Sequence, residues 1–189
     1  IVRRRIFFFF FNERESNIVL FVQKNLRFDF LDPIMQGITL LGNSGILPII
    51  VCIFLLLFKK TRKVGVTASL SLIFEAILIN LTIKKIVGRT RPYVVNEAIQ
   101  YITNRPSDNS FPSGHTGCSF AVASVLFYMM PKKVGIPAMI LASLIGISRL
   151  YVGVHYPTDI IGGFLIGMFT GFLAKLIVEK INKIRVKRV

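Results

Sequence analysis

Acidic residues, cysteine and histidine are all scarce in this chain of 189 residues. Asp and Glu together number 9 against 24 Lys and Arg, which leaves a formal net charge of +15 at pH 7. The 2 cysteines, Cys52 and Cys118, both lie inside apolar runs, so a disulfide-stabilised scaffold is excluded. Histidine also occurs only 2 times, and the position of each histidine is therefore informative.

Apolar residues, by contrast, make up 53% of the sequence. This fraction excludes an intrinsically disordered chain, which requires low hydrophobicity. A soluble nucleic-acid-binding protein would carry the basic surplus but would not need so much apolar surface, so no nucleic-acid partner is expected. The combination is typical of a polytopic membrane protein whose basic residues lie at the membrane edges.

The apolar residues gather in five stretches that can be compared with the roughly 20 residues needed to cross a bilayer. The stretches cover residues 33–58, 64–83, 115–130, 134–147 and 157–178. The third and fourth are short and are expected to extend into their flanks. The first is interrupted at Gly42–Gly45, so it is either one broken span or an interfacial helix followed by a shorter span. We predict an all-α, polytopic membrane helical bundle of about five transmembrane helices.

The N-terminal part is expected to differ from this bundle. Residues 1–15 are assigned to an N-terminal extension of uncertain order, and residues 16–189 to a single membrane domain. The consecutive aromatic residues Phe7–Phe11 are too few to span a membrane. From Ser16 to Leu31 apolar and charged residues alternate irregularly, which favours an N-terminal interfacial helix on the membrane surface. A plain packing helix fits that segment equally well.

Basic residues are divided unequally between the two ends of the predicted bundle. The loops at residues 59–63 and 131–133 and the C-terminal run are rich in Lys and Arg, with Glu179 as their one acid. The positive-inside rule places these segments in the cytoplasm and the long loop at residues 88–112 outside. The Arg3–Arg5 cluster argues against this orientation. The predicted location is the cell membrane, with the long loop, and any site that it helps to form, on the external face.

Both histidines lie where apolar stretches end on that external face. Pro112–His115 opens the third stretch, Ser148–Arg149 closes the fourth, and His155 lies just before the fifth. On the same face, Lys84 ends the second stretch and Arg91 follows seven residues later. The topology brings these ends together, and the resulting set of cations suits a phosphate group.

Four of these residues have properties that suit phosphate binding. Lys84, Arg91 and Arg149 would neutralise phosphoryl oxygens, and the two arginines can bind them bidentately. Ser113 is expected to cap the third helix, whose free backbone N–H groups can hold an anion.

Three further residues suit phosphoryl transfer. Asp159 follows His155 by four residues, so its carboxylate can hold the imidazole in one tautomer. His155 would then be the nucleophile, and His115 would protonate the departing oxygen as a general acid.

The complete pattern is Lys84-x6-Arg91-Pro92, Pro112-Ser113-Gly114-His115 and Ser148-Arg149-x5-His155-x3-Asp159. It resembles the three-part signature of the type 2 phosphatidic acid phosphatases (PAP2), which vanadium haloperoxidases and glucose-6-phosphatase share. Every signature residue is present at its spacing. The resemblance implies a metal-independent phosphatase without a cofactor, working through a phosphohistidine at His155, with His115 as acid and Asp159 as partner of His155. It assigns phosphate binding to Lys84, Arg91, Ser113, Gly114 and Arg149.

Three other functions fit the sequence less well. A transporter or channel would place ionisable residues near the membrane midplane, where Glu75 stands alone. A non-catalytic scaffold is disfavoured by the intact His155, His115 and Asp159. A haloperoxidase would need vanadate, but the apolar stretches favour a membrane substrate. Expected partners are membrane lipids and a lipid phosphate substrate, in the order undecaprenyl diphosphate, phosphatidylglycerophosphate and phosphatidic acid; the oligomeric state is left open.

Several remaining residues are given structural roles. Glu75 is expected to be a buried packing partner. Glycines repeated at every fourth position of the fifth stretch predict close helix packing inside the bundle: Gly163, Gly167 and Gly171. Three cations in or near the long loop are expected to face solvent or lipid head groups: Lys85, Arg89 and Arg105.

Overall fold

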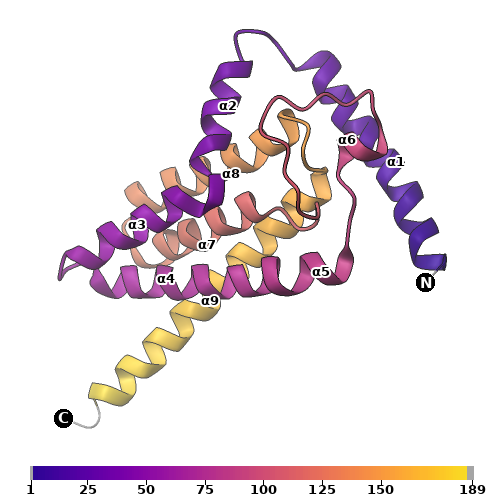
Figure 1. Ribbon diagram of the computed structural model, residues 1–189. Coiled ribbons are helices and arrows are strands. Elements are labelled where there is room, and N and C mark those ends of the chain that lie inside the picture. Colours follow the sequence, from indigo (N-terminus) through magenta and orange to yellow (C-terminus); the bar gives the residue numbers. More distant parts are fainter. Residues whose placement is uncertain (1, 187–189) are drawn as a thin grey trace.

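The computed structural model describes the backbone of residues 2–186 and the side chains of residues 12–43 and 45–184. All regular structure in this part of the chain is helical, as the sequence predicts. Helix α7 packs against α4, α8 and α9 (Figure 1). The elements are α1 (Val2–Asn25), α2 (Asp32–Leu41), η1 (Asn43–Gly45), α3 (Ile46–Leu57), α4 (Arg62–Ala76), η2 (Ile77–Ile83), α5 (Lys84–Val87), α6 (Pro92–Val95), α7 (Gly114–Met129), α8 (Lys132–Tyr151) and α9 (Pro157–Val186).

Helices α7 and α9 approach each other closely because α9 has glycines on the contacting face. A methyl group on Gly163 would lie 2.6 Å from the carbonyl oxygen of Ser113, and one on Gly167 would lie 2.6 Å from that of Gly117. At Gly171 the same addition would collide with the side chain of Ser124. The predicted packing role of these glycines inside the bundle is confirmed, and it brings the first turn of α9 onto the first turn of α7.

The first apolar stretch forms two helices rather than one. Helices α2 and α3 are bent by 48° across η1, and Gly45 adopts the left-handed conformation at φ 67° just before α3 begins. Glycine takes this conformation without a steric cost. The break predicted at Gly42–Gly45 is therefore present, and the bend leaves space beside α7.

Three described helical segments are long and apolar enough to cross a membrane: Arg62–Val95, Lys132–Tyr151 and Pro157–Ile184. The bent pair α2–α3 makes a fourth if it is counted as one span. Helix α7 has 16 residues, fewer than the roughly 20 that a straight span requires. By length and composition, the described residues therefore give three or four spans, against the five predicted.

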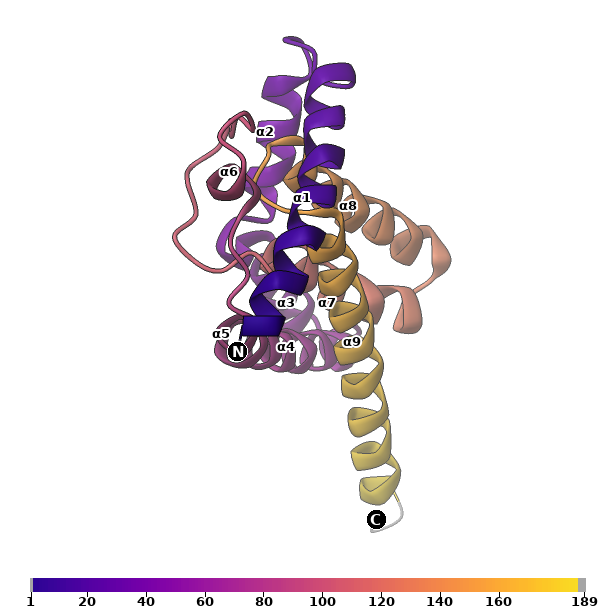
Figure 2. The same cartoon turned by 90° about the vertical axis from the view of Figure 1, so that its right-hand side faces the viewer.

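Helix α1 (Val2–Asn25) is continuous through residue 15, the predicted boundary between the N-terminal extension and the membrane domain. It ends at Asn25, so the predicted surface helix from Ser16 to Leu31 is too long. Val19 of α1 is fully buried in a cluster with Tyr93 and Tyr151, so this half of the helix packs against the protein. Figure 2 shows α1 beside the upper part of α9. The side chains of Arg3–Arg5 and Phe7–Phe11 lie outside the described residues.

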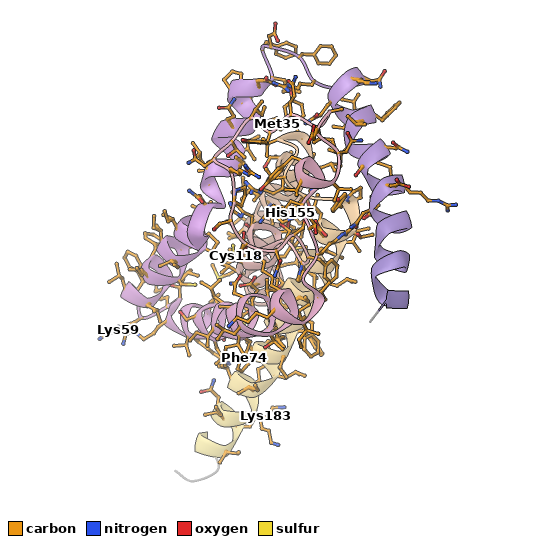
Figure 3. The ribbon with its side chains drawn as sticks, turned by 45° about the vertical axis from the view of Figure 1, so that its right-hand side comes forward. Met35, Lys59, Phe74, Cys118, His155 and Lys183 are labelled. Carbon is orange, nitrogen blue, oxygen red and sulfur yellow. The ribbon has the colours of Figure 1, made fainter. Side chains whose placement is uncertain are left out.

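The two ends of the bundle differ in the residues that lie there. Lys59 and Lys183 lie toward one end and Met35 toward the other, with His155 on the Met35 side of the middle (Figure 3). The long segment between α5 and α7, which contains α6, folds over the Met35 end (Figure 1). The segments that carry the candidate site therefore meet at one end of the molecule.

Candidate active site

A π-helix delivers Lys84 to the site. The buried residues before it on α4 and η2 are spaced by four (Ser71, Glu75, Ile79), but Lys84 follows Ile79 by five. In an α-helix five residues turn about 500°, so Lys84 would face about 140° away from Ile79. The backbone N–H of Lys84 instead bonds to the carbonyl of Ile79, and this wider turn returns the side chain to the buried face. π-turns of this kind recur at functional sites.

The signature turn before α7 is held by local caps and by α9. Ser113 is the N-cap of α7, as predicted, and its hydroxyl accepts a hydrogen bond from the N–H of Thr116 at 3.4 Å. The N–H of Ser113 donates to the carbonyl of Asp159 at 3.0 Å. A Cβ on Gly114 would lie 3.6 Å from the Lys84 ammonium. The free N–H groups at the start of α7 therefore lie beside a cation, an arrangement that favours anions.

His155 and Asp159 form a fully buried pair. Nδ1 of His155 lies 3.1 Å from Oδ2 of Asp159, and the same oxygen accepts hydrogen bonds from the N–H of Tyr156 at 2.9 Å and from the hydroxyl of Ser110. A carboxylate is an acceptor, so Nδ1 carries the proton and Nε2 carries the lone pair. The structure thus places an unprotonated imidazole nitrogen on the side of the ring away from the carboxylate.

Arg91 lies on the Nε2 side of that imidazole. Its Nη1 donates to the carbonyl of Val154 at 2.7 Å and lies 3.3 Å from Nε2 of His155. Burial lowers the pKa of His155 to about 4, together with the Arg91 charge and against the hydrogen bond to Asp159, which raises it. The imidazole is therefore neutral at pH 7, and its lone pair faces the cation.

Arg149 and His115 line a cavity of about 510 Å³ between η1, η2 and α7. Arg149, on the last turn of α8, is buried and donates from Nη1 to Thr39 at 2.7 Å. Its Nε has no hydrogen-bond partner among the described residues. Arg149, His155 and Lys84 all lie within electrostatic range of His115. An unpaired buried guanidinium N–H costs free energy, which an anion in this cavity would recover.

The carboxylate of Asp108 occupies part of this cationic site. It forms ion pairs with Lys84 and with Arg91, the latter at 2.6 Å. Burial raises the pKa of Asp108, but hydrogen bonds and charge from Lys84 and Arg91 overcome this and lower it to about 2. Its side chain is 50% exposed, so the loop presents an anion at the mouth of the site.

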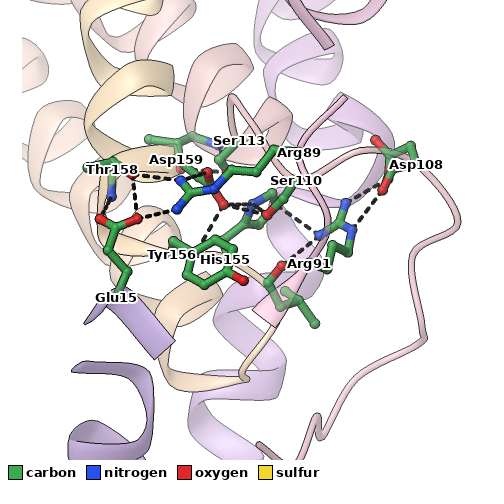
Figure 4. A network of polar contacts seen from close by, with 12 residues as sticks. Glu15, Arg89, Arg91, Asp108, Ser110, Ser113, His155, Tyr156, Thr158 and Asp159 are labelled. Atoms are coloured by element: carbon green, nitrogen blue, oxygen red, sulfur yellow. Dashed lines mark hydrogen bonds and ion pairs between the residues drawn. The ribbon is translucent and has the colours of Figure 1, made fainter. Parts of the chain in front are cut away.

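The structure also corrects the expectation for Arg89. This residue is 4% exposed and pairs with Asp159 and with Glu15 of α1, so it faces neither solvent nor lipid head groups (Figure 4). Arg89, Glu15, Ser110 and Asp108 were all missed as site residues. A signal was present for one of them, because the scarce acid Asp108 lies between the signature cations in the sequence.

Glu75 is buried, as expected, and it lines the same cavity. Its Oε1 has no hydrogen-bond partner among the described residues, and it packs against Gly117 of α7. Among the described residues, no three His, Cys, Asp or Glu side chains are grouped to hold a metal ion. The site is dominated by guanidinium, ammonium and backbone N–H donors, which together suit a phosphate group.

Lys84, His115 and Arg149 line the cavity, whereas His155 and Arg91 are buried outside its lining, within electrostatic range of His115. A cationic pocket beside a buried His–Asp pair, at one end of an apolar helical bundle, defines a membrane enzyme of phosphate chemistry. The sequence pattern of the PAP2 superfamily matches residues 64–183, and the chain belongs to this superfamily. Its relatives are named as phosphatases, and the chain is accordingly a hydrolase that acts on phosphate esters.

Two curated relatives have different names. The chain is 37% identical to phosphatidylglycerophosphatase B of Bacillus subtilis over 177 residues, covering 86% of this chain and 82% of that protein. It is 38% identical to an undecaprenyl-diphosphatase of Sulfolobus acidocaldarius over 120 residues, covering 64% of this chain and 58% of that protein. The chain thus matches little more than half of the second relative's length.

A crystal structure gives the same fold. The transmembrane PAP2 type phosphatidylglycerolphosphate phosphatase from Bacillus subtilis superimposes with a TM-score of 0.73 at 30% identity, covering 95% of this chain and 96% of that one. The helical bundle described above is therefore that of a membrane PAP2 phosphatase.

Proposed function

We propose that this protein is a metal-independent lipid phosphate phosphatase that works through a phosphohistidine at His155. The observation that carries the proposal is the orientation of His155. Its Nδ1 proton is held by Asp159, and its Nε2 lone pair faces the cations. This is the arrangement that a nitrogen nucleophile needs for attack on a phosphate held by Arg91 and Arg149.

In the first step, Nε2 of His155 attacks the terminal phosphorus. The bond from that phosphorus to the bridging oxygen of a diphosphate, or to the ester oxygen of a monoester, breaks. His115 protonates that oxygen as it leaves. The positive charge that develops on His155 is stabilised by Asp159. The negative charge on the phosphoryl oxygens is stabilised by Lys84, Arg91, Arg149 and the backbone N–H of Gly114 at the start of α7. His115 enters this step as the imidazolium, which the negative charge of the bound phosphate stabilises, and leaves it neutral.

In the second step, water attacks the phosphohistidine and the bond from phosphorus to Nε2 breaks. His115, now neutral, accepts a proton from that water. Inorganic phosphate leaves, and both histidines return to their starting states. All charge stabilisation in this scheme comes from side chains and backbone N–H groups, which supports catalysis without a metal.

The enzyme is proposed to be a multi-pass protein of the cell membrane with about five spans, α7 being the short one, and with its site on the external face. The distribution of basic residues supports this orientation, because Lys59 and Lys183 lie away from the Met35 end (Figure 3). A site there would meet lipids whose phosphate is exposed outside and whose chains remain in the bilayer.

For the substrate we place undecaprenyl diphosphate first, phosphatidylglycerophosphate second and phosphatidic acid third. An external site supports the first, and so does the name of the Sulfolobus relative. The name of the longer Bacillus relative supports the second. A diphosphate carries more negative charge than a monoester, which suits a pocket with several cations.

The test is phosphate release by the purified protein from these three lipids in one detergent, with and without EDTA. We expect undecaprenyl diphosphate to have the highest kcat/KM and EDTA to have no effect. His155→Ala should abolish turnover, and Glu97→Gln, at an exposed acid of the same loop, should not. A preference for a glycerolipid would reverse the substrate order alone, whereas turnover by His155→Ala would overturn the mechanism.

A further inference from the structure

Arg89 lies at the junction between helix α1 and the His155–Asp159 pair. Its Nη1 donates to Oδ1 of Asp159 at 2.7 Å and to the hydroxyl of Thr158 at 2.7 Å. Its Nη2 is paired with Glu15, its Nε donates to Asn12 at 2.9 Å, and the guanidinium lies over the ring of Tyr156 (Figure 4). A buried guanidinium is stable only when it is paired in this way.

The two oxygens of Asp159 have separate partners. Oδ2 faces Nδ1 of His155 and the N–H of Tyr156, while Oδ1 faces Arg89. A carboxylate held at one oxygen can still rotate about its side-chain bonds, but contacts at both oxygens fix its plane. Arg89 supplies the contact at Oδ1 which, together with the three contacts at Oδ2, fixes the direction in which Oδ2 faces the imidazole.

Glu15 in turn holds Arg89 and the beginning of α9. Its carboxylate pairs with Arg89 and accepts hydrogen bonds from the N–H of Thr158 at 3.2 Å and from its hydroxyl at 2.8 Å. The N–H groups of a first helical turn have no partner within their own helix, so Glu15 satisfies one of them from a different helix. Helix α1 is thereby fastened to the turn that carries Asp159.

We infer that Arg89 and Glu15 are positioning residues for catalysis, acting through Asp159 to orient His155. This inference rests on the proposed function, in which His155 is the nucleophile. Arg89 contacts the oxygen of Asp159 that His155 does not use, and Glu15 contacts Arg89 and Thr158. The described contacts of both residues lie on the far side of Asp159 from Nε2, so they govern the rate of the chemical step rather than phosphate binding.

The inference is tested with Arg89→Gln, Arg89→Lys and Glu15→Gln, using Lys85→Gln as the control at an exposed cation. Complete loss of the Asp in a Ser-His-Asp triad costs about 10⁴-fold in kcat. Loss of a residue that only orients the Asp should cost less, about 10- to 100-fold for Arg89→Gln. KM and inhibition by inorganic phosphate should stay within about threefold, because uniform binding is untouched.

A double-mutant cycle separates positioning from general support of the fold. In an Asp159→Asn background, Arg89→Gln should cost almost nothing further, because the group it orients is already gone. Equal losses in both backgrounds, or unchanged kcat in Arg89→Gln, would overturn the inference while leaving the phosphatase assignment intact. If Arg89→Gln does not fold, Arg89→Lys and Glu15→Gln provide the test. The inference then requires that both variants lower kcat while KM stays constant. Turnover by His155→Ala would instead overturn the proposed function itself.

Discussion

At the scale of single residues, the proposed attack by His155 depends most on the tautomer and the pKa of its imidazole. With burial lowering its pKa to about 4, the imidazole is expected to remain neutral, with the proton on Nδ1, throughout the neutral range. The chain has 2 histidines, so ring-nitrogen NMR of histidine-labelled protein gives two sets of signals, and His115→Asn assigns them. The His155 signals should titrate near pH 4. A midpoint near 6.5, the ordinary value, would contradict the buried pair.

Asp108 provides a second test at this scale. Its carboxylate pairs with Lys84 and Arg91 in the described structure, so a phosphate bound by these two cations, as proposed, would have to replace it. Asp108→Asn should therefore bind inorganic phosphate or vanadate more tightly, by about three- to tenfold, or about 0.7–1.4 kcal/mol. The gain is modest because the carboxylate is 50% exposed and its ion pairs are screened by water.

The measurement is the inhibition constant of phosphate or vanadate in steady-state assays of the Asp108→Asn enzyme. Glu97→Gln removes an exposed acid from the same loop and should leave that constant unchanged. Weaker inhibition of the Asp108→Asn enzyme would mean that the carboxylate helps to hold the cations in place for phosphate.

At the scale of helices, the π-turn of η2 accommodates one residue more than an α-helix would. Deleting Leu81, which is 62% exposed, would restore a spacing of four between Ile79 and Lys84. In an α-helix this keeps the two side chains within about 40° of one face. We expect this variant to fold and to retain activity within about tenfold of the parent enzyme.

Deletion of Ile73, which is 55% exposed on α4, is the matched comparison. The α4 helix around it is regular, so the deletion rotates one part of the helix against the other by about 100°. Phosphate release should then fall more than about a hundredfold, since either the packing face or Lys84 is displaced. Equal losses in the two deletions would show that the π-turn itself is required.

The sequence predicts those helices whose ends are set by contacts between neighbouring residues. It does not predict features that depend on contacts between distant parts of the chain. Ser113 and Pro157 mark helix starts through contacts within one turn, so α7 and α9 were placed correctly. The π-turn was not foreseen, because it depends on the packing of α4 and η2 against α7 and α9. The signature side chains could be grouped because helix ends alternate between the two faces of a bundle. Arg89 could not be assigned to the site from the sequence, because its partner Glu15 lies 74 positions away.

At the scale of the whole molecule, the proposed orientation in the membrane can be tested by thiol labelling. A cysteine at Asn109, exposed on the long loop, should react with an impermeant thiol reagent applied to intact cells. A cysteine at Lys132, exposed before α8, should react only after the membrane is opened. The native Cys52 and Cys118 are buried, so labelling of the parent protein measures the background reaction of these two thiols. The reverse pattern would place the active site in the cytoplasm, against the distribution of basic loops.

The order along the chain of the residues proposed for catalysis has a consequence for biosynthesis. Lys84, Arg91 and Arg149 are made before His155 and Asp159, and the turn that carries the last two is held by packing of α9 on α7. Under the proposed mechanism, a nascent chain that has not yet inserted α9 would have the cations for phosphate but no oriented nucleophile. Hydrolysis would then begin only after α9 has docked on α7, and the growing polypeptide would leave the lipids around it intact.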